Sequence, residues 1–80
     1  MADIREDLKS ILLEIAEDVE PNNVNYDSNF ITDLSLDSMI LLEFGSELES
    51  KYDIQIPEEE YPNMATINQT AELIKKLQVK

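Results

Sequence analysis

The sequence contains no cysteine and no histidine. Without cysteine the chain has neither disulfides nor thiolate metal sites, and without histidine it lacks the commonest general base and metal ligand. We therefore expect no metal site and no catalytic centre made of its own side chains, so the chain is predicted not to be an enzyme. No apolar run approaches a membrane span in length, and no basic segment followed by an apolar one marks a leader. A cytoplasmic protein without membrane insertion is predicted.

Basic residues are scarce as well. The 80 residues include 18 Asp and Glu against 6 Lys and Arg, for a formal net charge of −12. From Ser10 to Ile74, fifteen acidic residues stand against one base, Lys51. Such a surface repels nucleic acid and anionic membranes, and it attracts basic protein surfaces most strongly at low salt. The alternative is that the charge only keeps the protein soluble.

Turn-forming residues are also few, with one Gly and three Pro, and apolar residues recur at helical spacing. This spacing predicts a first helix over residues 3–19, with Asp3 and Glu6 forming a capping box and Pro21 stopping the helix. A long connection over residues 20–36 follows. Apolar residues that we expect to pin this connection to the core are Tyr26, Phe30, Ile31, Leu34 and Leu36.

Two more helices and one short element are predicted in the second half of the chain. A helix over residues 37–52 is capped by Asp37 or Ser38. A short helix or turn occupies residues 58–61, and the last helix begins at Thr66 with a T-x-x-Q capping box. The predicted fold is therefore all-α: a small bundle of three main helices plus one short helix, with a long first loop.

The second helix is apolar on more than one side. Met39 to Leu42 form a continuous apolar turn, and Phe44, Leu48 and Tyr52 then continue one face. Such a helix either is buried all round or presents a surface to a partner. Because a single domain of residues 1–80 is too small to bury it completely, we expect Met39 and Leu42 to be exposed.

Extended motifs connect the chain with a known family. Residues 33–39, DLSLDSM, resemble the D-L-G-L-D-S-L signature of acyl carrier proteins, and residues 42–44, LEF, stand where that family has V-E-L. Residues 48–57, LESKYDIQIP, resemble its L-E-x-x-F-x-I-x-I-P, and Thr66-Ile67 matches a T-V pair that opens the last helix. Over nearly its whole length the chain thus resembles a stand-alone, phosphopantetheine-dependent acyl carrier protein.

The resemblance implies a covalent cofactor on Ser38, with Asp37 beside it. In the family a separate phosphopantetheinyl transferase moves 4′-phosphopantetheine from coenzyme A onto this serine, and the terminal thiol of the arm holds acyl groups as thioesters. A serine at the start of a helix exposes its hydroxyl, and the positive end of the helix dipole favours a phosphate there. On spacing alone, Ser38 and Asp37 are helix caps worth about 1 kcal/mol.

The resemblance implies two further sites. One is a surface that meets acyl-loading and acyl-processing enzymes through their basic docking patches, at Asp37, Met39, Leu42, Glu43, Glu49 and Ile56. The other is a pocket for the acyl chain, for which the candidate lining residues are Phe30, Leu41, Leu48, Tyr52, Ala65 and Ile74. The alternative for each acid is an ordinary solvated face, and for each apolar residue it is core packing.

Several positions depart from the family pattern. Ser35 replaces the usual glycine, and Ile40 stands where an acid usually follows the D-S-L motif. Ser46 and Ser50 occupy positions where fatty-acid members tend to have methionine and glutamate. Gly45 costs about 1 kcal/mol relative to alanine inside a helix, and it leaves room for an acyl chain or a close helix contact. These departures indicate a specialised carrier.

Three functions remain open at this point. The first is a monomeric acyl carrier of fatty-acid or polyketide biosynthesis. The second is an aminoacyl carrier, either peptidyl or D-alanyl, with which the D-S-M sequence is compatible. The third is an unmodified helical adaptor in which Ser38 is only a cap.

Overall fold

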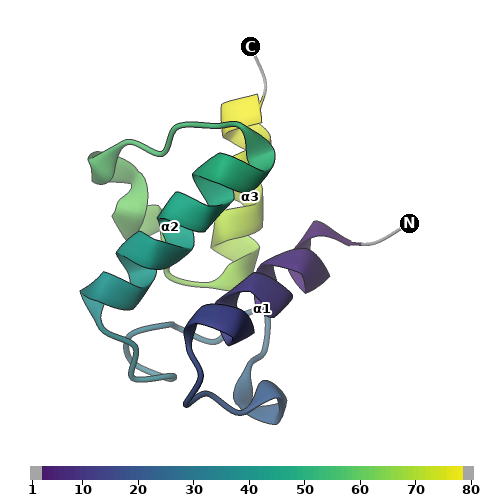
Figure 1. The fold of residues 1–80 in the computed structure, drawn as a ribbon, viewed down its shortest axis with the longest axis vertical. Coiled ribbons are helices and arrows are strands. Elements are labelled where there is room, and N and C mark those ends of the chain that lie inside the picture. Colours follow the sequence, from purple (N-terminus) through teal and green to yellow (C-terminus); the bar gives the residue numbers. More distant parts are fainter. Residues whose placement is uncertain (1–2, 79–80) are drawn as a thin grey trace.

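The computed structural model describes residues 3–78, and all regular elements within that range are helical. Three main helices alternate with two short 3-10 segments in this range, and Figure 1 shows how the main helices are arranged. The prediction of an all-α fold with three main helices and one short one is confirmed, whereas the 3-10 turn in the first connection was not predicted. In chain order the elements are α1 (Ile4–Ile15), η1 (Pro21–Asn23), α2 (Ser38–Tyr52), η2 (Glu58–Met64) and α3 (Ile67–Gln78).

The first helix is shorter than its apolar spacing predicts. Asp3 caps it by accepting the N–H of Arg5 at 2.9 Å, and hydrogen bonds from Arg5 lower the pKa of Asp3 to about 2. The capping box is incomplete, because the Glu6 carboxylate accepts from the Tyr26 hydroxyl instead. The helix ends at Ile15 rather than at residue 19, since the backbone of Ala16 leaves the helical region.

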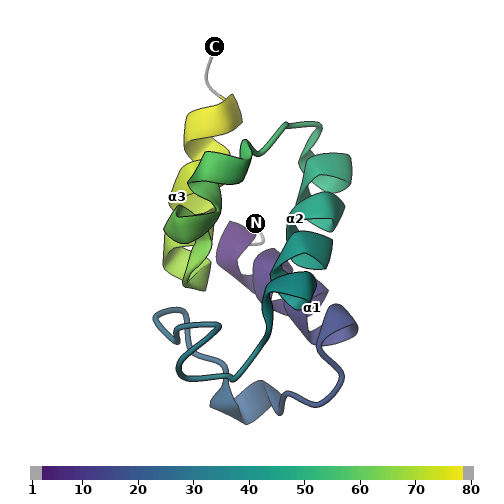
Figure 2. The same cartoon turned by 90° about the vertical axis from the view of Figure 1, so that its left-hand side faces the viewer.

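The three helices enclose one core. α1 packs against both α2 and α3, and η2 packs against α3 (Figures 1 and 2). Phe30 and Phe44 meet edge to face at its centre, with their ring centroids 5.7 Å apart. The largest fully buried side chains are Phe30, Phe44, Leu8, Leu12, Leu48, Met64, Ile67, Ile74 and Thr70.

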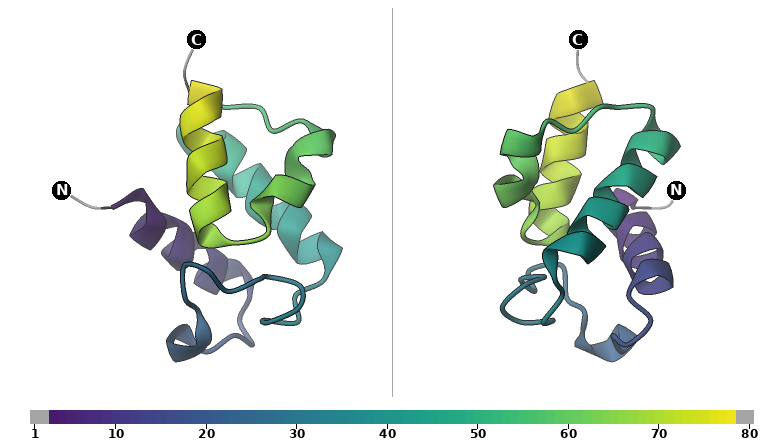
Figure 3. Two further views of the ribbon diagram at one scale, coloured as in Figure 1. Left: turned by 180° about the vertical axis from the view of Figure 1, so that it is seen from behind. Right: turned by 60° about the vertical axis from the view of Figure 1, so that its left-hand side comes forward.

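The connection between α1 and α2 runs beneath the helices in every view (Figure 3). It is pinned as predicted, because Phe30 is fully buried and its N–H donates to the Ala65 carbonyl at 2.8 Å. Val24 is buried too, which the sequence did not indicate. The prediction was wrong for Ile31, whose side chain is 45% exposed. The side-chain oxygen of Asn29 accepts the N–H of Ile31, and the resulting turn leaves Ile31 outside the core.

The segment before α3 differs in detail from the prediction. η2 extends to Met64 and contains Pro62, because the fixed φ of proline is compatible with a 3-10 turn. Thr66 caps α3 by accepting the N–H of Gln69 at 3.0 Å. The Gln69 side chain reaches back to the N–H of Ala65, one residue before the partner that a capping box requires. Within residues 3–78, no helix is long and apolar enough to cross a membrane.

Candidate functional site

Ser38 is the first residue of α2, and its side chain is exposed. Asp37 before it is the N-cap: its carboxylate accepts the N–H of Ile40 at 3.0 Å, and its carbonyl accepts the N–H of Leu41 at 3.3 Å. The cap fixes the direction in which the chain enters the helix. The structure therefore presents the Ser38 hydroxyl at a defined helix terminus where a visiting enzyme can reach it.

The loop before Ser38 is anchored by a buried leucine, which follows a serine in a left-handed turn. Leu36 is buried, and its N–H donates to the Phe30 carbonyl at 2.9 Å. Ser35 has a φ of 57°, in the left-handed region that glycine adopts without steric cost. This conformation explains why glycine is usual at this position of the motif. Ser35 thus adopts, with a side chain, a conformation that glycine would adopt without steric cost.

The start of α2 fits a phosphate ester. The first N–H groups of an α-helix have no partners within the helix, and the dipole of the 15-residue α2 adds partial positive charge there. Asp37 satisfies only the N–H of Ile40. A phosphate joined to Ser38 would therefore lie beside backbone donors, although the carboxylate of Asp37 adds repulsion. The sequence contains no histidine that could activate this hydroxyl as a nucleophile.

The outer face of α2 is apolar at its start. Met39 is 74% exposed and Leu42 is 50% exposed, as expected, and Glu43 beside them is exposed as well. At the other end of the helix, Glu49 is half-buried, and its carboxylate accepts the N–H of Ile56 at 2.8 Å. The Ile56 side chain is largely buried, although it lines a surface hollow beside Glu49, so its part in the partner surface stays a prediction. The other five predicted residues keep surface that a partner can contact.

The candidate acyl-pocket residues are packed together in the bundle. Phe30, Leu48 and Ile74 are fully buried, whereas Leu41, Tyr52 and Ala65 are partly buried. The Tyr52 hydroxyl is buried and has no hydrogen-bond partner among the described residues. Burial, and then the nearby Asp7 carboxylate, raise the pKa of Tyr52. An acyl cavity at these residues stays a prediction.

Gly45 lies under a tyrosine ring. A Cβ atom at this position would be 3.0 Å from Cε1 and 3.2 Å from Oη of Tyr61. Of the two explanations that the sequence left open for Gly45, close packing is therefore present, with the partner in η2 instead of a main helix. The side chain of Tyr61 thus reaches from η2 across to α2.

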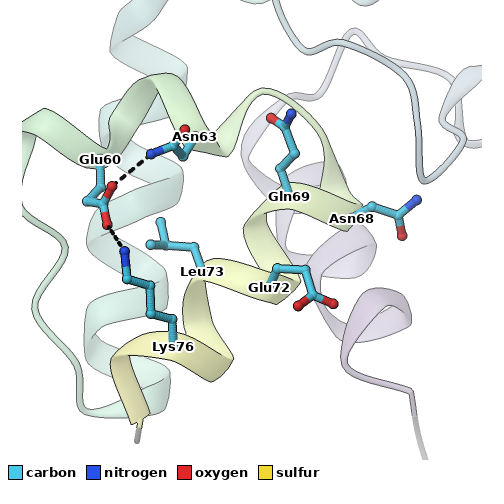
Figure 4. Close-up of a pocket in the computed structure, with 7 residues that line it drawn as sticks. All are labelled: Glu60, Asn63, Asn68, Gln69, Glu72, Leu73 and Lys76. Atoms are coloured by element: carbon cyan, nitrogen blue, oxygen red, sulfur yellow. Dashed lines mark hydrogen bonds and ion pairs between the residues drawn. The ribbon is translucent and has the colours of Figure 1, made fainter.

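Two surface hollows were not predicted. One, of about 480 Å³, lies between η2 and α3, where Glu60 accepts from Asn63 at 2.8 Å and pairs with Lys76 at 3.2 Å (Figure 4). The other, of about 550 Å³, lies between the end of α1 and the start of α2 and includes Asp37 and Ile40. The first lies between two consecutive elements, whereas the second joins segments that most of the first connection separates, so no local pattern could indicate it.

Comparison with known proteins agrees with the motif. The family model described as "Phosphopantetheine attachment site" matches residues 6–74. An acyl carrier protein of Rhodococcus erythropolis is 32% identical, over 98% of this chain and 89% of the relative. A meromycolate extension acyl carrier protein of Mycolicibacterium smegmatis is 33% identical, over 98% of this chain and 82% of the relative. An acyl carrier protein of a Sulfurovum species is 33% identical, over 90% of this chain and 95% of the relative.

The fold has a solved counterpart. A solution structure of a non-covalent extended docking domain complex of the Pax NRPS superposes with a TM-score of 0.80. The match covers 99% of this chain and 72% of that one, at 22% sequence identity, so it supports the fold alone.

Together these matches define a class: helical domains that bear a phosphopantetheine attachment site. The chain belongs to the acyl carrier protein family, whose members carry a covalently attached 4′-phosphopantetheine.

Proposed function

We propose that this protein carries acyl intermediates as thioesters on a phosphopantetheine arm attached to Ser38. The observation that carries the proposal is the exposed Ser38 hydroxyl at the capped start of α2, inside the DLSLDSM motif. When bound, the arm supplies a terminal thiol, which a chain without cysteine otherwise lacks. The chain's own residues present the arm at the surface, where both water and partner enzymes can reach it.

Asp37 has two roles in this proposal. As N-cap it sets the geometry of the first turn, and as an exposed charge it is one of the acids that a transferase meets beside the serine. Met39, Leu42 and Glu43 continue the same exposed region along α2. Desolvation of the apolar pair stabilises a complex, and the acids steer and orient basic partner surfaces.

The chemistry of loading and processing belongs to other proteins. The partners are a phosphopantetheinyl transferase and the acyl-loading and acyl-processing enzymes of fatty-acid or polyketide biosynthesis. The chain itself works as a monomeric carrier domain over residues 1–80 and catalyses no step. Similarity to acyl carrier proteins, one of them named for meromycolate extension, supports the acyl class of cargo. Cytoplasmic location stays a prediction.

Intact mass spectrometry tests the attachment residue. The purified chain is incubated with coenzyme A, Mg²⁺ and a broad-specificity phosphopantetheinyl transferase. The wild type should gain one phosphopantetheine unit, and Ser38→Ala should gain none. Ser46→Ala, which removes another exposed serine of the same helix, is the matched control and should be modified like the wild type. A folded wild type that stays unmodified beside a known carrier would leave the unmodified adaptor as the better account.

A further inference from the structure

The hollow between α1 and α2 lies close to Ser38 but on another side of the helix. It is formed by the end of α1, the loop before α2 and the first turn of α2. Asp37 and Ile40, which precede and follow Ser38, are both among its residues. At 3.6 residues per turn, Ile40 is rotated by about 200° from Ser38 around α2, so it faces away from the serine. Asp37, by contrast, adjoins Ser38 at the N-terminal end of the helix and lines the hollow. A protein that covers this end of α2 can therefore contact both Ser38 and the rim of the hollow.

The hollow combines apolar walls with carboxylates. Its walls include the partly buried Ile15, Val19 and Ile40, and the exposed carboxylates are those of Glu17, Asp18 and Asp37. None of its residues is basic, and the chain has no lysine or arginine between Lys9 and Lys51. Among residues 3–78, the ion pairs involve none of these three acids.

This composition selects one kind of occupant. A purely apolar group would bring carboxylates out of water without a partner, which costs free energy. A small cation would leave the apolar walls unused. A long basic side chain satisfies both, because its aliphatic stem packs on apolar surface while its charged head meets the acids. Guanidinium presents five donors in a planar fork and is less strongly hydrated than ammonium, so it suits several carboxylates at once.

We propose that this hollow receives an arginine side chain from an enzyme that acts on the carrier. The inference rests on the proposed function, because it assigns one contact within the basic docking surface of such an enzyme. Ile40 is central to it: where the family usually has an acid, this chain offers an apolar wall to the arginine stem. The remaining acids, Glu17 and Asp18, come from the turn after α1 and extend the docking surface beyond α2.

A titration of the unmodified chain tests the hollow without any enzyme. The probe is n-butylguanidinium, which imitates the arginine stem and head, and methyl NMR signals report its binding. Signals of Ile15, Val19 and Ile40 should shift together and saturably, while that of the exposed Ile31 should not. n-Butylsulfonate, with the same stem and the opposite charge, is the control. No shift at the three residues, or equal shifts with the sulfonate, would overturn the proposal.

Transferase kinetics test the hollow in a complex. The double variant Glu17→Gln/Asp18→Asn is compared with Glu58→Gln/Glu59→Gln, which removes the same charge from the exposed start of η2. The first pair should raise KM for the carrier roughly tenfold and leave kcat unchanged, whereas the control should change KM by less than about twofold. Equal increases in KM would mean long-range attraction only and refute the docking site. If the wild type is not modified at all, the proposed function fails, and the titration alone decides the hollow.

Discussion

Replacing Gly45 by alanine tests how closely η2 is packed against α2. Alanine is favoured over glycine inside a helix by about 1 kcal/mol, so an unobstructed Gly45→Ala variant would be more stable. Here the added Cβ would meet Tyr61 at 3.0 and 3.2 Å, closer than ordinary contacts. Overpacking typically costs about 1–3 kcal/mol. We therefore expect Gly45→Ala to lower the free energy of unfolding by up to about 2 kcal/mol, in spite of its better helix propensity.

A double-mutant cycle separates the two effects. Tyr61→Leu removes the ring over Gly45 while keeping an apolar side chain in η2. In that background, Gly45→Ala should raise the free energy of unfolding by about 1 kcal/mol. Urea unfolding followed by circular dichroism measures all four variants, and the coupling energy should be about 1–3 kcal/mol. If Gly45→Ala stabilises both backgrounds equally, the tyrosine does not pack on Gly45 and the reasoning is refuted.

Three further predictions concern single residues. Ser35→Gly should raise the free energy of unfolding by about 1 kcal/mol, because it relieves a left-handed serine; a loss of stability in thermal unfolding would contradict this. Asp37→Asn should leave the free energy of unfolding unchanged, because asparagine also caps a helix, whereas Asp37→Ala should lower it by about 1 kcal/mol. If the KM of the transferase for the carrier rises in both variants, the enzyme recognises the charge of Asp37 itself. Hydrogen bonds from Asn63 and then Lys76 lower the pKa of Glu60 below its ordinary value of 4.5, so they stabilise the fold above that pH and cease to do so on acidification. An NMR titration should find the Glu60 pKa higher in Lys76→Gln; no difference would contradict the contact.

The main helices were predictable because their apolar spacing and caps are local. Asp37 precedes α2 and Thr66 precedes α3, and each makes the capping bond that its residue type indicates. The end of α1 was not predictable in the same way. Val19 continues the apolar spacing, but it follows a turn in which its N–H donates to the Ala16 carbonyl, so the same spacing arises without a helix.

In the candidate site, too, the features set by local sequence were predictable and those set by contacts between elements were not. The exposure of Met39 and Leu42 followed from a helix with more apolar residues than a small core can bury. The burial of Ile56 did not follow, because this residue lies in an irregular segment after α2, where its N–H donates to the Glu49 side chain instead of to a helical carbonyl. The contact between Gly45 and Tyr61 likewise joins two elements whose meeting no local pattern encodes.

The most direct test of the central claim is to load the arm. The phosphopantetheine-bearing chain, the unmodified chain and Ser38→Ala are each incubated with ATP, a fatty acid and an acyl-activating ligase, and their intact masses are measured. Only the first should gain one acyl group, and neutral hydroxylamine should remove it, as expected of a thioester. Acylation of the unmodified chain, or loading only by an amino-acid-activating ligase with its amino acid, would contradict the assignment of this protein as an acyl carrier.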